Sequence, residues 1–152
     1  MSELLTICHE LLLAGNETTA NALSEGMLLL LKKSDELQKV LENQDLIPNM
    51  IDEILRCSSP GHSILRVVTC DTILGGEEIP KGSKLMLRYI SANRDERVFD
   101  DPERFKVDRT DVHRHLAFGE GGRHVCIGLM LARRELMIAF EQLFKRLKPV
   151  RI

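Results

Sequence analysis

The stretch from Leu116 to Gly128, LAFGEGGRHVCIG, constrains the fold most, because it sets four glycines around one cysteine just before a strongly helical segment. Glycine is costly in ordered backbone unless a positive φ or a close approach requires it. The backbone is therefore predicted to bend tightly around Cys126, against something flat or bulky. A thiolate at a helix N-terminus is stabilised by the helix dipole and by free N–H groups. This stretch alone leaves two interpretations open: a thiolate-ligated metal centre, or a glycine-rich loop with a buried free cysteine.

A second constraint is the long apolar segment near the start of the chain. Leucines and other apolar residues keep a helical period from Leu4 to Leu31, which predicts one helix of about 30 residues. Polar residues such as His9, Glu10 and Glu25 interrupt the apolar run. The segment is therefore interpreted as a buried helix and not as a membrane span.

The centre of this helix has an unusual composition. Gly15 and the two β-branched residues Thr18 and Thr19 interrupt good helix formers, which predicts a kink or a widened turn. The alternative is that Thr18 caps a second helix after a break at Gly15. A carboxylate and a hydroxyl at a helix distortion, here Glu17 and Thr18, suit a site that delivers protons.

Two shorter helices follow. Ser34 is expected to open an amphipathic helix that ends near Glu42, and Pro48 lies at an early position of a third helix that runs to about Cys57. Glu53 and Arg56 on the third helix are three residues apart and therefore share a face. They form either a solvated surface pair or, because apolar residues surround them, a partly buried ion pair.

Short strands and a long loop occupy the second half of the chain. The pattern predicts strands at 64–70 and 84–90, a hairpin turn at Gly75-Gly76 continued by 77–79, and a short helix at 93–99. Residues 100–122 form a long irregular loop, which inside a compact domain usually indicates function. Apolar residues from Leu129 to Leu147 predict a last helix, with Lys145, Arg146 and Lys148 near its end and Pro149 stopping it. The fold class is therefore mainly α with a small β region (α+β), in one domain.

Composition excludes several classes of function. The net charge of −2 and the scarcity of aromatic residues give no indication of nucleic-acid binding. The four cysteines are far apart and form no CxxC pair, which disfavours a zinc ribbon and a disulfide framework. Glu3 stands where a signal peptide would have positive charge, so no signal peptide is expected.

Motifs along the chain then align, in order, with one family. They are Ala14-Gly-Asn-Glu-Thr-Thr19, Glu53-Ile-Leu-Arg56, Asp101-Pro-Glu-Arg-Phe105, Gly122-Arg-His-Val-Cys-Ile-Gly128 and Leu131-Ala-Arg133. The chain resembles the C-terminal part of the cytochrome P-450 superfamily, the haem-thiolate monooxygenases. The resemblance implies a long distal helix, a Glu-x-x-Arg helix, a small antiparallel sheet, a meander with a Cys loop, and a proximal helix.

The resemblance also implies a role for each matching residue. Cys126 would be the axial ligand of the iron of haem b, and Thr18 and Glu17 would be the catalytic residues that hydrogen-bond oxygen and deliver protons. His124 and Arg66 would bind the haem propionates. The remaining expected cofactor-binding residues are Ala14, Gly15, Phe118, Gly122 and Gly128.

A structural triad is implied as well. Glu53, Arg56 and Arg104 would hold the meander against the core, with Arg109 as the less favoured third member. Their role would be structural and not catalytic.

The chain departs from the family pattern in two respects. Phe118 lies eight residues before Cys126, where the family places its Phe seven residues before the Cys. Either the loop holds an extra glycine, or Phe118 packs differently. In addition, residues 1–152 are expected to be a single partial domain, without the N-terminal half and the final strands of the family.

The implied activity is haem-dependent monooxygenation: activation of O2 at thiolate-ligated iron and insertion of one oxygen atom into a small apolar organic substrate. A ferredoxin-type or flavoprotein partner would supply electrons to a soluble, bacterial-type, cytoplasmic enzyme without a membrane anchor in this chain. Two alternatives stay open: a truncated, non-catalytic fragment with weak or no haem binding, and a helical interaction domain with a free cysteine. The apolar long helix further predicts that the chain associates.

Overall fold

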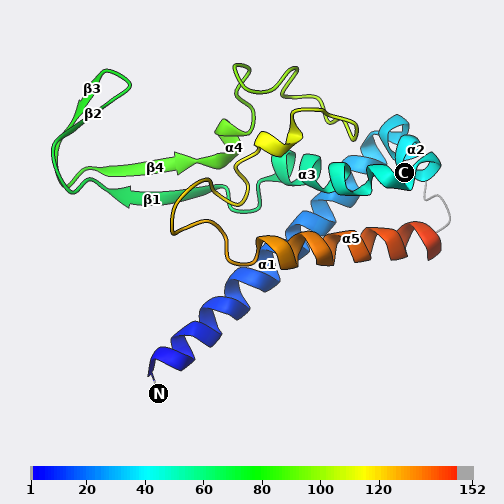
Figure 1. Ribbon diagram of the computed structural model, residues 1–152, viewed down its shortest axis with the longest axis horizontal. Coiled ribbons are helices and arrows are strands. Elements are labelled where there is room, and N and C mark those ends of the chain that lie inside the picture. Colours follow the sequence, from blue (N-terminus) through cyan, green and yellow to red (C-terminus); the bar gives the residue numbers. More distant parts are fainter. Residues whose placement is uncertain (1, 147–152) are drawn as a thin grey trace.

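The chain folds into a cluster of helices from which a β ribbon and one half of the longest helix project (Figure 1). The computed structural model describes residues 2–146. The helices are α1 (Ser2–Lys32), α2 (Ser34–Glu42), α3 (Ile47–Ser58), α4 (Tyr89–Ala92) and α5 (Leu129–Arg146), with 3-10 turns η1 (Gln44–Leu46) and η2 (Val112–Arg114). The strands are β1 (Ser63–Val67), β2 (Thr72–Leu74), β3 (Glu77–Ile79) and β4 (Lys84–Arg88). The predicted class, mainly α with a small antiparallel β region, is confirmed.

Helix α1 is continuous across its unusual centre. Every residue from Ser2 to Lys32 is α-helical, so the predicted widened turn and the alternative of a break at Gly15 are both wrong. The Thr18 hydroxyl donates to the carbonyl of Ala14 at 2.6 Å, which occupies the side chain locally and leaves the helix ladder intact. Gly15 is tolerated because it lies on the exposed side of the helix, with open space around its Cα.

The core forms where the second half of α1 crosses α3 and α5. Gly26 makes this crossing possible, since a Cβ at that position would lie 2.7 Å from Cδ1 of Ile54 and 3.1 Å from the ring of Phe140. The buried apolar residues of this core cluster come from α1, α2, α3, α5 and the irregular segment after α4: Ala22, Leu30, Val40, Ile47, Met50, Ile51, Ile54, Leu55, Phe105, Val107, Leu136 and Phe140.

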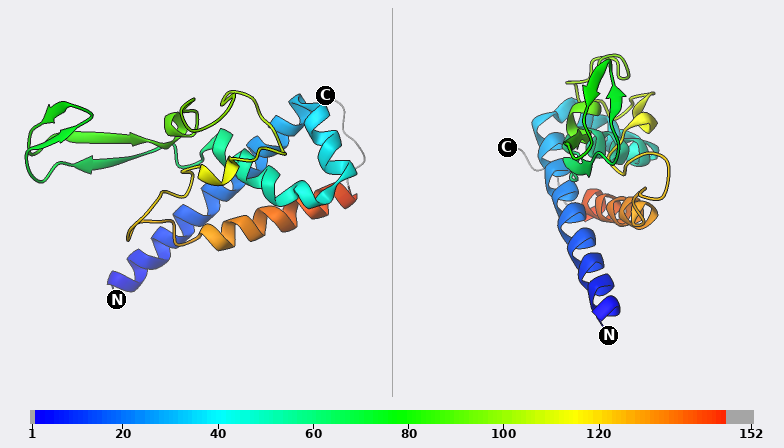
Figure 2. Two further views of the ribbon diagram at one scale, coloured as in Figure 1. Left: turned by 45° about the horizontal axis from the view of Figure 1, so that its top comes forward. Right: turned by 90° about the vertical axis from the view of Figure 1, so that its left-hand side faces the viewer.

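The first half of α1 has a different environment. It extends away from the helical cluster in Figures 1 and 2, and its leucines are exposed, Leu4 by 66% and Leu12 by 73%. A helix that is apolar on most of its surface yet exposed leaves a large apolar area in contact with solvent. None of the described helices is both long and apolar enough to span a bilayer.

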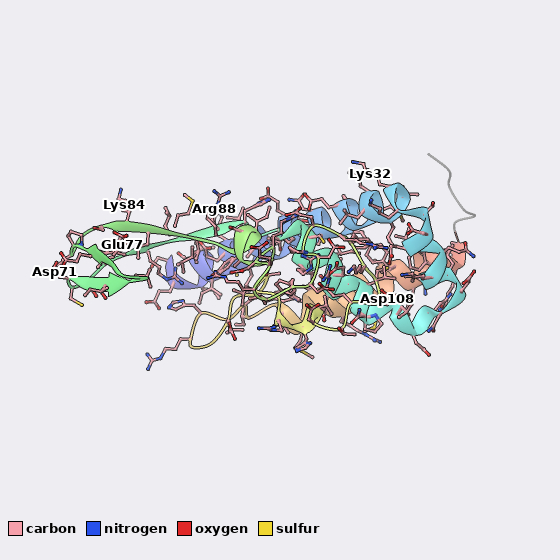
Figure 3. The ribbon with its side chains drawn as sticks, turned by 90° about the horizontal axis from the view of Figure 1, so that it is seen from above. Lys32, Asp71, Glu77, Lys84, Arg88 and Asp108 are labelled. Atoms are coloured by element: carbon pink, nitrogen blue, oxygen red, sulfur yellow. The ribbon has the colours of Figure 1, made fainter. Side chains whose placement is uncertain are left out.

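The β ribbon is built from two antiparallel pairs. Strand β1 pairs with β4 from Ser63↔Arg88 to Val67↔Lys84, and β2 pairs with β3 across the predicted Gly75-Gly76 turn. Both glycines have positive φ, 62° and 90°, as a tight hairpin turn requires. Figure 3 shows the labelled Asp71 and Glu77 at the end of the ribbon, far from Asp108 in the helical cluster.

Several boundaries differ from the prediction. The strand predicted over 64–70 ends at Val67, and the strand predicted over 84–90 ends at Arg88, where α4 begins. The helix predicted at 93–99 is replaced by turns. The buried Asn93 side chain explains this difference, because it donates to Ser59 Oγ at 2.8 Å and accepts from Leu116 N–H at 2.7 Å. An asparagine used in this way favours a turn over a helix.

The remaining helices agree with the sequence. α2 has the predicted bounds, α3 ends one residue later than predicted, and α5 carries Lys145 and Arg146 in its last turn. The predicted stop at Pro149, with Lys148, lies outside the described residues.

Candidate functional site

Glu53 and Arg56 form a fully buried ion pair on α3. Arg56 donates from Nε to one carboxylate oxygen at 2.7 Å and from Nη2 to the other at 2.9 Å, and both side chains are 0% exposed. Arg56 Nη1 also donates to the carbonyls of Asn93 and Pro102, at 2.7 and 2.8 Å. The buried interpretation of this pair is therefore correct, and the solvated one is wrong.

The third member of this cluster is Arg109 and not Arg104. Nε of Arg109 lies 3.0 Å from both carboxylate oxygens of Glu53, and its guanidinium donates to the carbonyls of Asp100, Asp101 and Arg104. Arg104 contributes that carbonyl, whereas its side chain is exposed. Its neighbour Phe105 turns into the core, only 3% exposed, and Arg104 therefore points outward.

Cys57, beside this pair, lies in a low-dielectric environment. Burial, reinforced by the negative charge of Glu53, raises the pKa of the Cys57 thiol to about 11. The neutral thiol is therefore the favoured form at physiological pH, which lowers the reactivity of Cys57.

The Cys loop, residues 118–128, bends at glycines as predicted. Gly119, Gly121 and Gly122 have φ of 74°, 61° and 77°. The bend returns the chain so that Cys126 N–H donates to the Phe118 carbonyl at 3.0 Å. Cys126 is exposed, which contradicts the alternative of a buried free cysteine.

The two ends of the glycine-rich turn differ in packing. A Cβ on Gly121 or Gly122 would meet only open space, whereas Phe118 is partly buried and packs against the core. Phe118 is therefore held at the start of the loop, while the turn leaves room around its backbone.

The environment of Cys126 fits a flat apolar group. Val125 and Ile127 are 39% and 94% exposed, so apolar side chains flank the sulfur without covering it. A Cβ at Gly128 would lie 3.8 Å from the Cys126 Sγ, in van der Waals contact, so the glycine keeps one side of the sulfur open. α5 begins at Leu129, so the Cys loop leads directly into the N-terminus of this helix. The residues present fit a haem on the exposed side of the loop.

The other predicted haem residues lie on separate elements. His124 is exposed in the Cys loop, and Arg66 is half-buried on β1, where its Nη1 donates to the Leu65 carbonyl at 3.0 Å. In Figures 1 and 2 the Cys loop lies on the side of the molecule from which the β ribbon and the first half of α1 project. Within residues 2–146, no side-chain hydrogen bond joins His124 or Arg66 to Cys126.

The predicted distal residues lie in the exposed half of α1. Glu17 and Thr18 are exposed, as are Ala14 and Gly15. The Thr18 hydroxyl is engaged with the Ala14 carbonyl, so it must rotate before it can donate to a ligand.

Over the part of the chain that the structure describes, no group of three or more His, Cys, Asp and Glu side chains could hold a metal ion. When iron is held in a porphyrin, the protein supplies only axial ligands, which a single cysteine can do.

Sequence reasoning missed polar residues that hold the long loop in place. Glu36 on α2 is 1% exposed and accepts from Val107 N–H at 2.8 Å, and Asn49 on α3 donates to the carbonyls of Val107 and Arg109. It also missed a cluster of Asp52, His115 and Arg133. The only available signals were that Asp52 adjoins Glu53 and that Arg133 ends the Leu-Ala-Arg motif.

Comparison with known proteins agrees with these observations. The family model described as Cytochrome P-450 matches residues 1–149. The chain therefore belongs to the cytochrome P-450 family.

Individual relatives are bacterial. The chain is 42% identical over 142 residues to a steroid monooxygenase from Mycolicibacterium smegmatis, covering 93% of this chain and 35% of that protein. It is 41% identical to a methyl-branched lipid omega-hydroxylase from Mycobacterium bovis, covering 92% of this chain and 33% of the relative. A crystal structure of a cytochrome P-450 from Bacillus megaterium with corticosterone matches with a TM-score of 0.91 and 36% identity, over 95% of this chain and 39% of that one. The chain thus spans about a third of the length of the curated relatives it matches.

Proposed function

We propose that this chain supplies the thiolate side of the haem site in a monooxygenase, which inserts one oxygen atom from O2 into an organic substrate. The observation that carries the proposal is the exposed sulfur of Cys126, at the end of a glycine-bent loop and directly before α5. Membership of the cytochrome P-450 family supports the same assignment.

The proposed cofactor is haem b. When bound, a thiolate-ligated haem supplies the electron-rich iron that cleaves the O–O bond. Cys126 would hold the iron, while Val125 and Ile127 would cover the porphyrin with apolar surface and keep water from the sulfur. His124 and Arg66 would pair with the propionates, where a charge-assisted bond fixes orientation.

Proton delivery is proposed for the centre of α1. Rotation of the Thr18 side chain away from the Ala14 carbonyl would free its hydroxyl to donate on the distal side. Glu17, adjacent and exposed, would relay protons from solvent.

A small apolar organic substrate and a ferredoxin-type or flavoprotein electron donor complete the proposal. The relatives named above include proteins that act on a steroid and on a branched lipid, which supports the apolar class of substrate.

The test is the absorption spectrum of the purified chain with added haem, reduced under carbon monoxide. We expect the red-shifted Soret band of thiolate ligation. Cys126→Ser should abolish this band, whereas Cys70→Ser, which removes another exposed cysteine, should leave it unchanged. A band typical of histidine ligation, or no bound haem, would refute the proposal and favour the alternative of a non-catalytic fragment.

A further inference from the structure

Three charged or polar side chains from distant segments meet next to the Cys loop. Asp52 lies on α3, His115 follows η2, and Arg133 lies in the second turn of α5. Arg133 Nε donates to Asp52 Oδ1 at 2.9 Å, and His115 Nε2 lies 3.4 Å from the same oxygen. Asp52 and Arg133 are separated by 81 residues, so the contact depends on the completed fold.

Both ring nitrogens of His115 have polar neighbours. Ala117 N–H donates to His115 Nδ1 at 3.1 Å, and Nε2 lies between Asp52 Oδ1 at 3.4 Å and Arg133 Nη2 at 3.5 Å. The His115 side chain is 2% exposed, against 21% for Asp52 and 36% for Arg133. The histidine is therefore the buried centre of the cluster and the arginine is its solvent-facing cover.

Phe118 packs against this cluster. The Arg133 guanidinium carbon lies 5.5 Å from the centre of the Phe118 ring, and the His115 and Phe118 ring centres are 6.0 Å apart at 51°. A planar guanidinium over an aromatic face is attractive and has a preferred orientation. The ring of Phe118 thus packs against two members of the cluster.

The hold on Phe118 extends to Cys126 through the backbone. The Phe118 carbonyl accepts the Cys126 N–H at 3.0 Å, and the turn between them provides little packing, because Gly121 and Gly122 face open space. Cys126 is therefore held from both sides, because its carbonyl also accepts the Leu129 N–H at the start of α5, at 3.3 Å.

We propose that Asp52, His115 and Arg133 form a positioning clamp that fixes Phe118 and, through its carbonyl, the backbone of Cys126. The three side chains are positioning residues and not catalytic ones, since their contacts lead to Phe118 and to α5 and not to the Cys126 sulfur. Any effect of the clamp on haem ligation rests on the function proposed above. The clamp itself consists of contacts within the protein and does not require haem.

The first test measures hydrogen exchange of the haem-free chain by mass spectrometry with residue resolution. Asp52→Asn and Arg133→Gln should each speed exchange of the Cys126 amide about tenfold, because a charge-assisted bond is lost. The Val107 amide, held by Glu36, should not change. Arg134→Gln is the matched control, since Arg134 is the exposed neighbour of Arg133. Unchanged exchange at Cys126, or equal acceleration at Cys126 and Val107, would overturn the proposal.

A second variant separates charge from shape. Arg133→Lys keeps a cation for Asp52 but loses the planar contact with Phe118. We expect exchange at Cys126 between that of wild type and that of Arg133→Gln. Exchange as fast as in Arg133→Gln would equally support the clamp. Exchange equal to that of wild type would show that the contact between Arg133 and Phe118 does not hold the loop, and would overturn the proposal.

The spectrum of the haem-loaded chain gives the third readout. The fraction of the ferrous carbon monoxide complex with the thiolate band should fall at least twofold in Arg133→Gln and stay at the wild-type level in Arg134→Gln. An unchanged fraction would contradict the link from the clamp to the thiolate. If wild type itself lacks the band, the proposed function fails. The exchange measurements on the haem-free chain then still show whether the clamp holds the backbone of Cys126.

Discussion

Arg109 Nε lies 3.0 Å from both carboxylate oxygens of Glu53, and the two side chains are 2% and 0% exposed. With Arg56 on the other side, one buried carboxylate faces two buried guanidinium groups. Asp111 offsets part of the excess positive charge, since its Oδ1 lies 3.6 Å from Arg109 Nη1, and backbone carbonyls of the irregular segment after α4 accept from both arginines. This cluster attaches that segment to α3.

The first prediction concerns the arginine at the third position. Arg109→Gln should lower the free energy of unfolding by about 3–5 kcal/mol, because it leaves Glu53 with one cation and removes the donors of several buried carbonyls. Arg104→Gln, whose altered side chain is exposed, should change it by less than about 0.5 kcal/mol. Urea unfolding followed by circular dichroism measures both values, and equal losses would contradict the assignment.

Two glycines of α1 should respond to alanine with opposite sign. Gly26→Ala places a Cβ 2.7 Å from Ile54 Cδ1 and should cost about 1–3 kcal/mol through overpacking. Gly15→Ala meets open space and should gain about 0.5–1 kcal/mol of helix stability. Thermal unfolding of the two variants, compared with wild type, gives the signs; a gain at Gly26 would show that the crossing of α1 and α3 is looser than it is here.

Thr18→Ala should separate stability from function. The Thr18 hydroxyl is bonded only to its own helix, so its loss should raise helix stability by up to about 0.5 kcal/mol. If Thr18 delivers protons, the variant should release more peroxide per electron in the haem-loaded chain supplied with a redox partner. Thr6→Ala is the matched control, because Thr6 makes the same bond to Ser2 on the same helix; an equal rise in peroxide in both variants would exclude a specific role of Thr18.

The cysteines should differ in reactivity. A thiol with a pKa of about 11 is thiolate in only about one molecule in a thousand at pH 8, so iodoacetamide should modify Cys57 far more slowly than Cys70. Because burial and Glu53 raise the pKa, the Cys57 rate should rise about tenfold per pH unit up to about pH 10. Peptide mass spectrometry follows each site, and a rate that levels off near pH 8 would contradict the raised pKa.

The exposed leucines of α1 should drive association. The apolar surface from Leu4 to Leu13 should make the purified chain oligomerise in sedimentation velocity. The double variant Leu5→Gln/Leu12→Gln should shift it toward monomer, whereas Ile73→Gln, equally exposed on the ribbon, should have little effect. A monomeric wild-type chain would show that this surface is not adhesive.

Much of the fold was predictable because its signals are local. The period of leucines defines α1 and α5, Pro48 marks the start of α3, and Gly75-Gly76 defines a hairpin turn through its positive φ. The bends of the Cys loop were predictable for the same reason, since they depend on glycine itself.

The choice between Arg104 and Arg109 was not predictable, because it depends on which way the segment turns as it crosses α3. The residue that points inward there is Phe105, and this leaves Arg104 outside. The meeting of Asp52 with Arg133 likewise depends on how α5 packs on α3, which no local pattern encodes. Helix propensity also failed at Asn93, where a buried amide holds a turn.

Many of the bonds that hold the long loop on α3 are made to its carbonyl groups. Arg56 of α3 binds the carbonyls of Asn93, Pro102 and Arg104, and every amino acid carries the same carbonyl. Arg109, itself in the loop, joins Glu53 of α3 to the carbonyls of Asp100, Asp101 and Arg104. The loop can therefore exchange its outward-facing side chains freely while its path is retained, whereas neither arginine can be exchanged. Such an arrangement lets the outer surface of the molecule diversify over evolution without disturbing the position of the helix beneath it.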